Sequence, residues 1–430
     1  MPLELNAALQ RKLQAQIAET LRRATLTSYG SASVLDFWPL TESGEQALHS
    51  LNQEARDNIT EWLGNSPIFS LVFNQVLEEI DSIDRDKREA GAALTSLPGF
   101  EDAQARSQQF VLQLMALPHE YVVSFPLSDG LASFFQNRGF GPLECGTVNI
   151  AGSWHGATSN SFPPVPMLAN EQVREPFFSG LSMPAKLPFP APVQELSALC
   201  VQIRVGGLIT GMTTEPIKRA RDELKALIGL AVATDLVKEQ FGMLAASESA
   251  RFAQAHEMRD SSWVALTMRR GIVDVPAPIS KTIFNPEVED IYPRLESLVR
   301  LLGTPRVGAR LKLAGRWMFD AWANSSDPVM RFMQFAIAME VLLQSDPGDS
   351  GLTKTLANRC AYLIATSTDE REAIRKEFPK LYSLRSKIVH NGTDRFSRDE
   401  HALARRFREI CGRVVAAEMR LALADVTKGA

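Results

Sequence analysis

Helix start and stop signals crowd the last hundred residues of this 430-residue chain, and they constrain its fold more than any other feature. Asp327-Pro328 is a cap followed by a first-turn proline, and apolar residues at helical spacing continue to about residue 344. Turn chemistry follows in Asp346-Pro-Gly-Asp-Ser-Gly. A second helix is expected over about 352–366, with Leu352, Leu356, Arg359 and Leu363 on one stripe.

Two further helices complete this region. Ser367-Thr-Asp-Glu370 has the pattern of a capping box, which predicts a third helix from about 368. Pro379 should interrupt it, with a second segment from 380 to 390 that stops at Asn391-Gly392. A second capping-box pattern, Ser397-Arg-Asp-Glu400, opens a helix to about 424. Four helices joined by short turns predict an antiparallel four-helix bundle.

The rest of the chain combines helical patterns with three short β-branched or aromatic runs. These runs, at about 120–127, 146–150 and 199–205, predict strands. Eight prolines between Pro163 and Pro192 exclude regular structure there and predict a long loop. Helices are expected at about 3–26, 44–63, 68–88, the stretch SQQFVLQLMAL, 215–241, 250–270, 286–302 and 306–324.

The predicted fold class is therefore mainly α with a smaller β-containing middle region and a C-terminal bundle. The expected divisions are a helical N-terminal region (1–118), a β-containing region with a proline-rich loop (119–215), a helical connector (216–308) and the bundle (309–430). The length suits two or three domains.

Composition is that of an ordinary globular protein, with 45% hydrophobic residues, 22% charged residues and a net charge of -4. No apolar segment is long enough to predict a membrane span, and the four cysteines are isolated, so neither a zinc ribbon nor a disulfide scaffold is expected. We therefore expect a reduced, cytoplasmic protein without a metal or cofactor. Residues 326–430 hold 17 Lys and Arg against 14 Asp and Glu, a weak positive balance.

The chemistry-bearing motif is Tyr382-Ser-Leu-Arg385-Ser386-Lys387-Ile-Val-His390-Asn-Gly392. It resembles the motif of HEPN domains, in which an Arg is followed, after four to six intervening residues, by a His late in a helical bundle. The full residue pattern is closer still to that of the Apea-like branch. Ala338-Met-Glu340-Val-Leu-Leu and Leu356-Ala-Asn-Arg359-Cys-Ala also look like that branch. The resemblance covers about residues 309–424 and implies a HEPN bundle that often cleaves RNA.

The residue types suit RNA cleavage by the 2′-hydroxyl of the substrate itself. A histidine titrates near neutral pH and can take or give the protons, so His390 is the candidate acid–base group. Arg385 offers a planar cation that matches phosphate oxygens. Ser386, Lys387 and Tyr382 are the expected active-site neighbours, although Ser386 departs from the Asn, Asp or His that often follows the arginine in HEPN nucleases.

Geometry argues against a site within one helix. Five residues along an α-helix correspond to about 500° of rotation, so Arg385 and His390 should lie roughly 140° apart. The resemblance implies the solution that catalytic HEPN proteins use, in which two protomers pair so that both motifs line one cleft. We therefore expect a homodimer that pairs through the C-terminal bundle.

Glu340 and Arg359 are charges placed among apolar residues, and such charges are seldom buried unless they are paired. Their pattern predicts a salt bridge between two helices of the bundle. The alternative is an accessory role beside the active site.

Three functional hypotheses remain open from the sequence. The first is a metal-independent endoribonuclease whose substrate is RNA, with residues 1–305 sensing an unknown trigger or restraining activity. The resemblance would place it in phage defence or a toxin-like stress response. The second is a HEPN module that binds RNA, nucleotide or protein without cutting. The third is an independent enzyme in residues 120–215 that the bundle merely dimerises, although no catalytic constellation is visible there.

Overall fold

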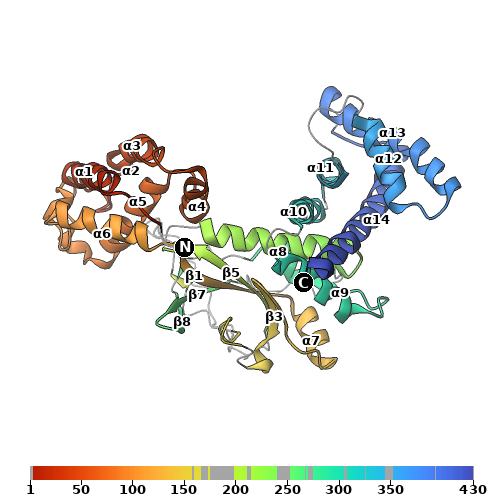
Figure 1. The fold of residues 1–430 in the computed structure, drawn as a ribbon, viewed down its shortest axis with the longest axis horizontal. Coiled ribbons are helices and arrows are strands. Elements are labelled where there is room, and N and C mark those ends of the chain that lie inside the picture. Colours follow the sequence, from red (N-terminus) through yellow and green to blue (C-terminus); the bar gives the residue numbers. More distant parts are fainter. Residues whose placement is uncertain are drawn as a thin grey trace, which may run out of the picture.

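The structure is a computed structural model, and it describes most of the chain. The described residues are 3–156, 159–165, 173–174, 198–210, 215–239, 252–266, 268–269, 275–304, 308–324, 326–343, 352–392 and 394–429. Most of the predicted proline-rich loop lies outside these residues. Figure 1 shows helices at both ends of the molecule and a sheet in the middle, under the long helix α8.

The N-terminal helices form a unit with their own core. They are α1 (Ala7–Arg23), α2 (Val34–Phe37), α3 (Pro39–Leu48), α4 (Gln53–Leu63), α5 (Pro67–Ser82) and α6 (Ala103–Ala116). Leu13, Leu71 and Phe110 are among the fully buried residues at its centre. The single helix expected over 44–63 is in fact two, because the chain turns after Leu48 and Asn52 caps the second one through the N–H of Ala55 at 2.8 Å.

The middle region is built on one antiparallel sheet with the order β2-β3-β5-β1-β7-β8. Its strands are β1 (His119–Pro126), β2 (Leu143–Cys145), β3 (Val148–Gly152), β5 (Leu199–Gly207), β7 (Gln254–Arg259) and β8 (Ser262–Ala265). Three helices border it: α7 (Asp129–Asn137), α8 (Glu215–Ala233) and α9 (Ile291–Gly303). Two small strand pairs are separate from it, β6 (Val237–Glu239) with β10 (Thr282–Phe284) and β4 (Val173–Arg174) with β9 (Met268–Arg269).

The helix expected over 250–270 is wrong, since residues 254–265 form the hairpin β7–β8 at the edge of the sheet. The hairpin turns at Asp260 and Ser261, which both have positive φ, as two-residue hairpin loops require. Four residues of β7 pair with β1. The predicted helical connector is therefore partly sheet, because pairing with β1 outweighs a local pattern that reads as helical.

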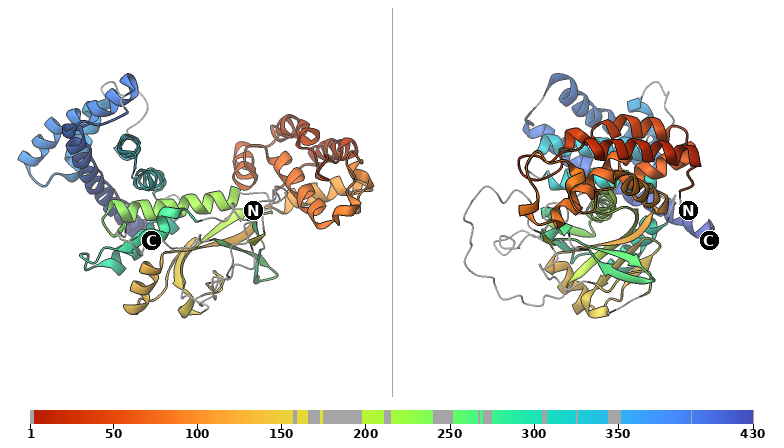
Figure 2. Two further views of the ribbon diagram at one scale, coloured as in Figure 1. Left: turned by 180° about the vertical axis from the view of Figure 1, so that it is seen from behind. Right: turned by 90° about the vertical axis from the view of Figure 1, so that its left-hand side faces the viewer.

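The two faces of the sheet differ in chemistry. Tyr121, Val123 and Phe125 of β1 belong to the same apolar core as the buried residues of α8. Figure 2 shows α8 lying across one side of the sheet. On the other face Asn149 and Gln202 are fully buried, and their side chains are joined by a hydrogen bond of 2.8 Å. A buried polar pair of this kind fixes the register of β3 against β5, because a one-residue slip would separate the two amides.

The C-terminal helices share a core with the sheet region. They are α10 (Ala309–Ala323), α11 (Pro328–Leu343), α12 (Leu352–Ile364), α13 (Thr368–Asn391) and α14 (Arg398–Gly429). Helices α11 to α14 pack against one another, and α10 joins them to α8. One continuous cluster of buried residues runs from Tyr121 to Met419. A mostly helical fold around a small central sheet is thus confirmed.

Helix α13 is continuous, so the interruption expected at Pro379 is wrong. Pro379 lies on the exposed face of the helix, as does Arg375, whose carbonyl loses its usual N–H partner. Water can satisfy that carbonyl, which lets the helix pass through the proline. The capping box predicted at the start of α14 is present. The N–H of Ser397 donates to the Glu400 carboxylate at 2.8 Å, and the N–H of Glu400 donates to the Ser397 hydroxyl at 3.3 Å.

Helices α8 and α10 touch through two glycines. A Cβ built on Gly229 would lie 1.9 Å from the carbonyl oxygen of Gly315, and one on Gly315 would lie 2.7 Å from that of Ala226. No side chain fits at either distance. The backbones can therefore pack this closely only because both positions are glycine.

We expect Gly229→Ala and Gly315→Ala each to lower the free energy of unfolding by about 1–3 kcal/mol, because the added methyl group overpacks the crossing. Thermal unfolding followed by circular dichroism measures the effect. Ala402→Leu is the control, since Ala402 is an exposed position of α14. A midpoint raised by either glycine substitution, as helix propensity alone would give, contradicts the prediction.

Candidate functional site

The motif predicted to carry chemistry lies at the C-terminal end of α13. The helix stops there because Gly392 adopts the left-handed conformation, with φ of 62°, and donates its N–H to the carbonyl of Ile388 at 3.1 Å. Gly392 has open space around it, so the requirement is conformational. This stop leaves His390 in the last turn of the helix.

Arg385 is held on the inner side of the helix by Glu340 of α11. Its Nε lies 3.3 Å from Glu340 Oε1, and the two side chains are 30% and 21% exposed. The Nε proton does not point at the carboxylate and has no hydrogen-bond acceptor among the described residues. Its two Nη groups likewise have no partner in the described part of the chain, so they are available to a phosphate group.

Tyr382 completes this cluster from one turn earlier on α13. Its ring lies 5.9 Å from the guanidinium carbon of Arg385, and its hydroxyl donates a hydrogen bond to Glu340. Burial raises the pKa of Tyr382, and the Glu340 carboxylate raises it further. Glu340 therefore fixes two side chains of the motif at once.

His390, Ser386 and Val389 are exposed on the outer side of α13. No described side chain forms a hydrogen bond or ion pair with His390, whose imidazole is open to a substrate or to another protein chain. Lys387 is also exposed, but its ammonium is bound to Glu400 at 2.6 Å. That contact, with the hydrogen bonds from Ser397, lowers the pKa of Glu400 to about 2.

The structure brings Arg385 and Tyr382 together with Glu340, but it does not bring Arg385 together with His390. The first three meet between α11 and α13, whereas His390 faces outward at the helix end. This is the separation that helical geometry predicts for a spacing of five residues. Tyr382 is only 8% exposed, so its ring packs against Arg385 from the buried side of α13.

The salt bridge expected between Glu340 and Arg359 is wrong. Arg359 is exposed, and its Nη1 donates to the carbonyl of Leu343 at 2.8 Å, where it caps the end of α11. The buried stripe of α12 consists of Leu356, Ala357, Cys360, Ala361 and Ile364. Arg359 lies beside this stripe, and among the described residues the cation within ion-pair distance of the half-buried Glu340 carboxylate is Arg385.

Sequence reasoning found the members of the Glu340–Tyr382–Arg385 cluster but not their arrangement. Tyr382 and Arg385 are three residues apart, a spacing that places them on one face of a helix. A lone glutamate in the apolar run Phe335-Ala-Ile-Ala-Met-Glu-Val-Leu-Leu needs a partner, and Arg359 was the partner predicted from the sequence. The spacing within α13 is the signal that favours Arg385.

Neither a metal cluster nor a membrane-spanning segment is seen in the described residues. No group of three or more His, Cys, Asp and Glu side chains there could hold a metal ion. Within the same residues, no helix combines the length and apolar character needed to cross a bilayer.

No protein-family model, no curated protein and no solved structure matches this chain.

The contacts of Glu340 predict which pair of residues is energetically coupled. In a double-mutant cycle, Glu340→Ala and Arg385→Ala should show a coupling of about 1 kcal/mol in the free energy of unfolding, because their contact is only partly screened by water. Glu340→Ala and Arg359→Ala should be additive within about 0.3 kcal/mol. Chemical denaturation of the three single variants, the two double variants and the parent measures both cycles. Coupling in the second cycle and none in the first would restore the salt bridge expected from the sequence.

Proposed function

We propose that this protein is an endoribonuclease of HEPN type, with Arg385 and His390 as its catalytic pair and RNA as its substrate. The observation that carries the proposal is the arrangement at the end of α13. Arg385 is held in place by Glu340, and its Nη groups form no hydrogen bond with the described residues. His390 is exposed five residues later and has no partner among the same residues. The resemblance of the motif to HEPN domains supports the same reading.

The proposed reaction needs only groups that the motif supplies. A base removes the proton of the 2′-hydroxyl, the oxygen–phosphorus bond forms, and the bond to the 5′-oxygen breaks as that oxygen receives a proton. The products are a 2′,3′-cyclic phosphate and a 5′-hydroxyl. An imidazole can serve either proton role, and the Nη groups of Arg385 can bind the non-bridging oxygens as negative charge develops on them. No step calls for a cofactor.

A second copy of the chain would complete this site. Arg385 and His390 face different directions on one helix, so two copies related by a two-fold axis are the simplest way to gather both around one phosphate. Val389 supports this pairing because it is 49% exposed, a large apolar side chain on the outer surface beside His390.

Binding of RNA without cleavage is the second candidate function. The observation that favours it is the same divergence of Arg385 and His390, which leaves a single copy with a phosphate-binding arginine but no complete acid–base site.

We expect His390→Ala and Arg385→Ala each to abolish cleavage of end-labelled single-stranded RNA in EDTA, because each removes a group that the reaction needs. His49→Ala and Arg375→Ala are matched controls, since both residues are exposed and lie outside the site. The same strand with 2′-O-methyl groups should remain intact. Cleavage at the parent rate in either motif variant refutes the assignment, and RNA that binds but stays uncut supports the second candidate.

We also expect the protein to dimerise through α13, with Val389→Asp producing monomers that do not cleave. A buried carboxylate at an apolar contact is unfavourable, whereas Val264→Asp, at an exposed position of β8, should leave the dimer intact. Sedimentation of the full chain measures association. Mixing inactive Arg385→Ala and His390→Ala protomers should restore activity, because one complete pair forms in each mixed dimer. A monomer that cleaves RNA at the parent rate rules out the shared site.

A further inference from the structure

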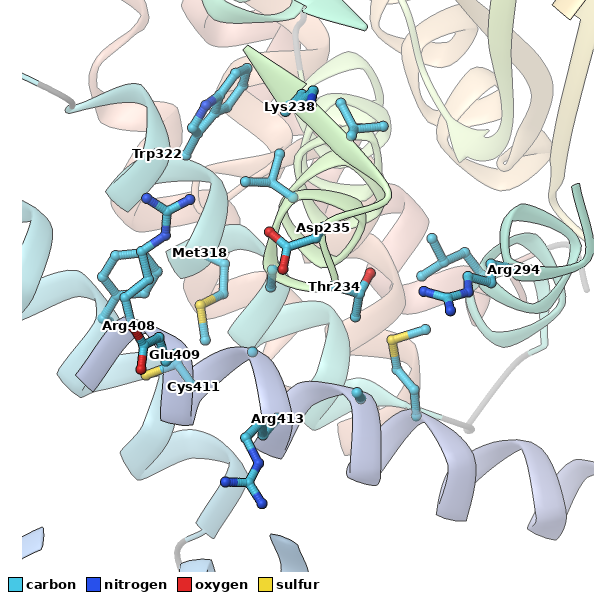
Figure 3. Close-up of a pocket in the computed structure, with 18 of the residues that line it drawn as sticks. Thr234, Asp235, Lys238, Arg294, Met318, Trp322, Arg408, Glu409, Cys411 and Arg413 are labelled. Carbon is cyan, nitrogen blue, oxygen red and sulfur yellow. The ribbon is translucent and has the colours of Figure 1, made fainter. Parts of the chain in front are cut away.

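A cavity of about 1280 Å³ lies where the sheet region meets the C-terminal helices. Its walls come from the end of α8, from β6 and α9, and from α10, α11 and α14. Figure 3 shows Thr234 and Asp235 between Trp322 and Lys238 on one side and Arg294 on the other. The cavity lies away from the motif, because none of the predicted site residues lines it.

The lining of this cavity is strongly basic. Eight of its residues are Lys or Arg, and only two, Asp235 and Glu409, are acidic. Among the described residues, five of these cations have no carboxylate partner: Lys238, Arg294, Arg405, Arg408 and Arg420. Cations that lie close together without counter-charges repel one another, so the cavity has a positive potential that attracts anions.

Two other arginines of the lining are already engaged. Arg406 is bound to Glu377 and Glu409 at 3.1 and 3.0 Å, and Arg413 to Glu370 at 2.6 Å. Figure 3 shows Arg413 directed away from Asp235 and Arg294. The unpaired cations are therefore the ones that a ligand would meet.

The floor of the cavity is apolar. Met318 and Leu298 are each 1% exposed, and Phe335 is 8% exposed. The half-buried indole of Trp322 adds an aromatic wall close to Lys238 (Figure 3). An apolar and aromatic floor below a rim of free cations suits a ligand that is flat at one end and multiply anionic at the other.

We infer that this cavity binds a nucleoside polyphosphate, with the base against the apolar floor near Trp322 and the phosphates among Arg294, Arg408 and Lys238. Several phosphate charges are needed to balance five unpaired cations, which a sugar phosphate or a carboxylate does not provide. An RNA strand would track an open basic groove with successive bases stacked along it. The aromatic side chains in the lining of this cavity are Trp322 and the buried Phe335, so the cavity offers a platform for one base and not a row of them. The inference does not depend on RNA cleavage.

Calorimetric titration of the full-length protein with ATP and with GTP tests the site. At least one of the two should bind, and Arg408→Ala and Arg294→Ala should each weaken binding by about 10- to 100-fold, as expected for a lost charged hydrogen bond to phosphate. Both arginines are exposed, so the folded state should tolerate the changes. Arg375→Ala is the control, because Arg375 is an exposed arginine outside the cavity. Circular dichroism of each variant checks that it is folded.

Inorganic triphosphate and a short single-stranded RNA separate the alternatives. Inorganic triphosphate should bind more weakly than the nucleotide, and Trp322→Ala should remove that difference. Triphosphate that binds as tightly as ATP and GTP would contradict the proposal that the apolar floor binds the base. RNA that binds through Arg408 and Arg294 in the His390→Ala protein, with no binding of either nucleotide, would overturn the inference. So would nucleotide affinity unchanged in both arginine variants.

Discussion

The close crossing of α8 and α10 is the contact on which the arrangement of the molecule depends. One side of α8 covers the sheet, and the other side meets α10 where Gly229 and Gly315 bring the two backbones together. Helix α10 leads directly into α11, and α11 carries Glu340, which holds Arg385. A displacement at the two glycines would therefore move the support of the proposed site as a whole. The C-terminal helices are an extension of the central core, since the buried cluster is continuous between them.

The sequence predicted the helices best where caps and apolar spacing agree, as at Asp327, Ser367 and Ser397. It failed where pairing partners lie far away along the chain. The hairpin over 254–265 has no local signal that outweighs a helical reading, because its stability comes from pairing with β1, which lies more than a hundred residues earlier. The continuity of α13 was missed for a different reason. Whether a proline breaks a helix depends on the solvation of the preceding turn, which the sequence does not display.

The candidate site was predictable in its members more than in its contacts. Spacing alone separates Arg385 from His390 on the helix, and the structure has them on different sides. The partner of Glu340 was predicted wrongly as Arg359, because the sequence does not show that Arg359 lies beside the buried stripe of α12 or that Arg385 approaches the carboxylate. The basic cavity was missed altogether, since its cations come from segments between residues 238 and 420 and the net charge of the C-terminal part conceals their clustering. The sequence signal for this cavity is the row of arginines at helical spacing along α14.

Helix α14 links the proposed active site to the cavity. Three ion pairs join it to α13 along their length, Lys387 with Glu400, Arg406 with Glu377 and Arg413 with Glu370. Hydrogen bonds from Thr366 and Arg413 lower the pKa of Glu370 to about 2, and that of Glu400 is lowered to about 2 by Lys387 and Ser397. A carboxylate whose pKa is depressed in this way stays ionised, and its pair persists, until the pH falls toward that value. Histidine side chains, in contrast, titrate between about pH 5 and 8. The helix pair that positions the motif therefore keeps these two carboxylate contacts throughout the range in which histidines titrate.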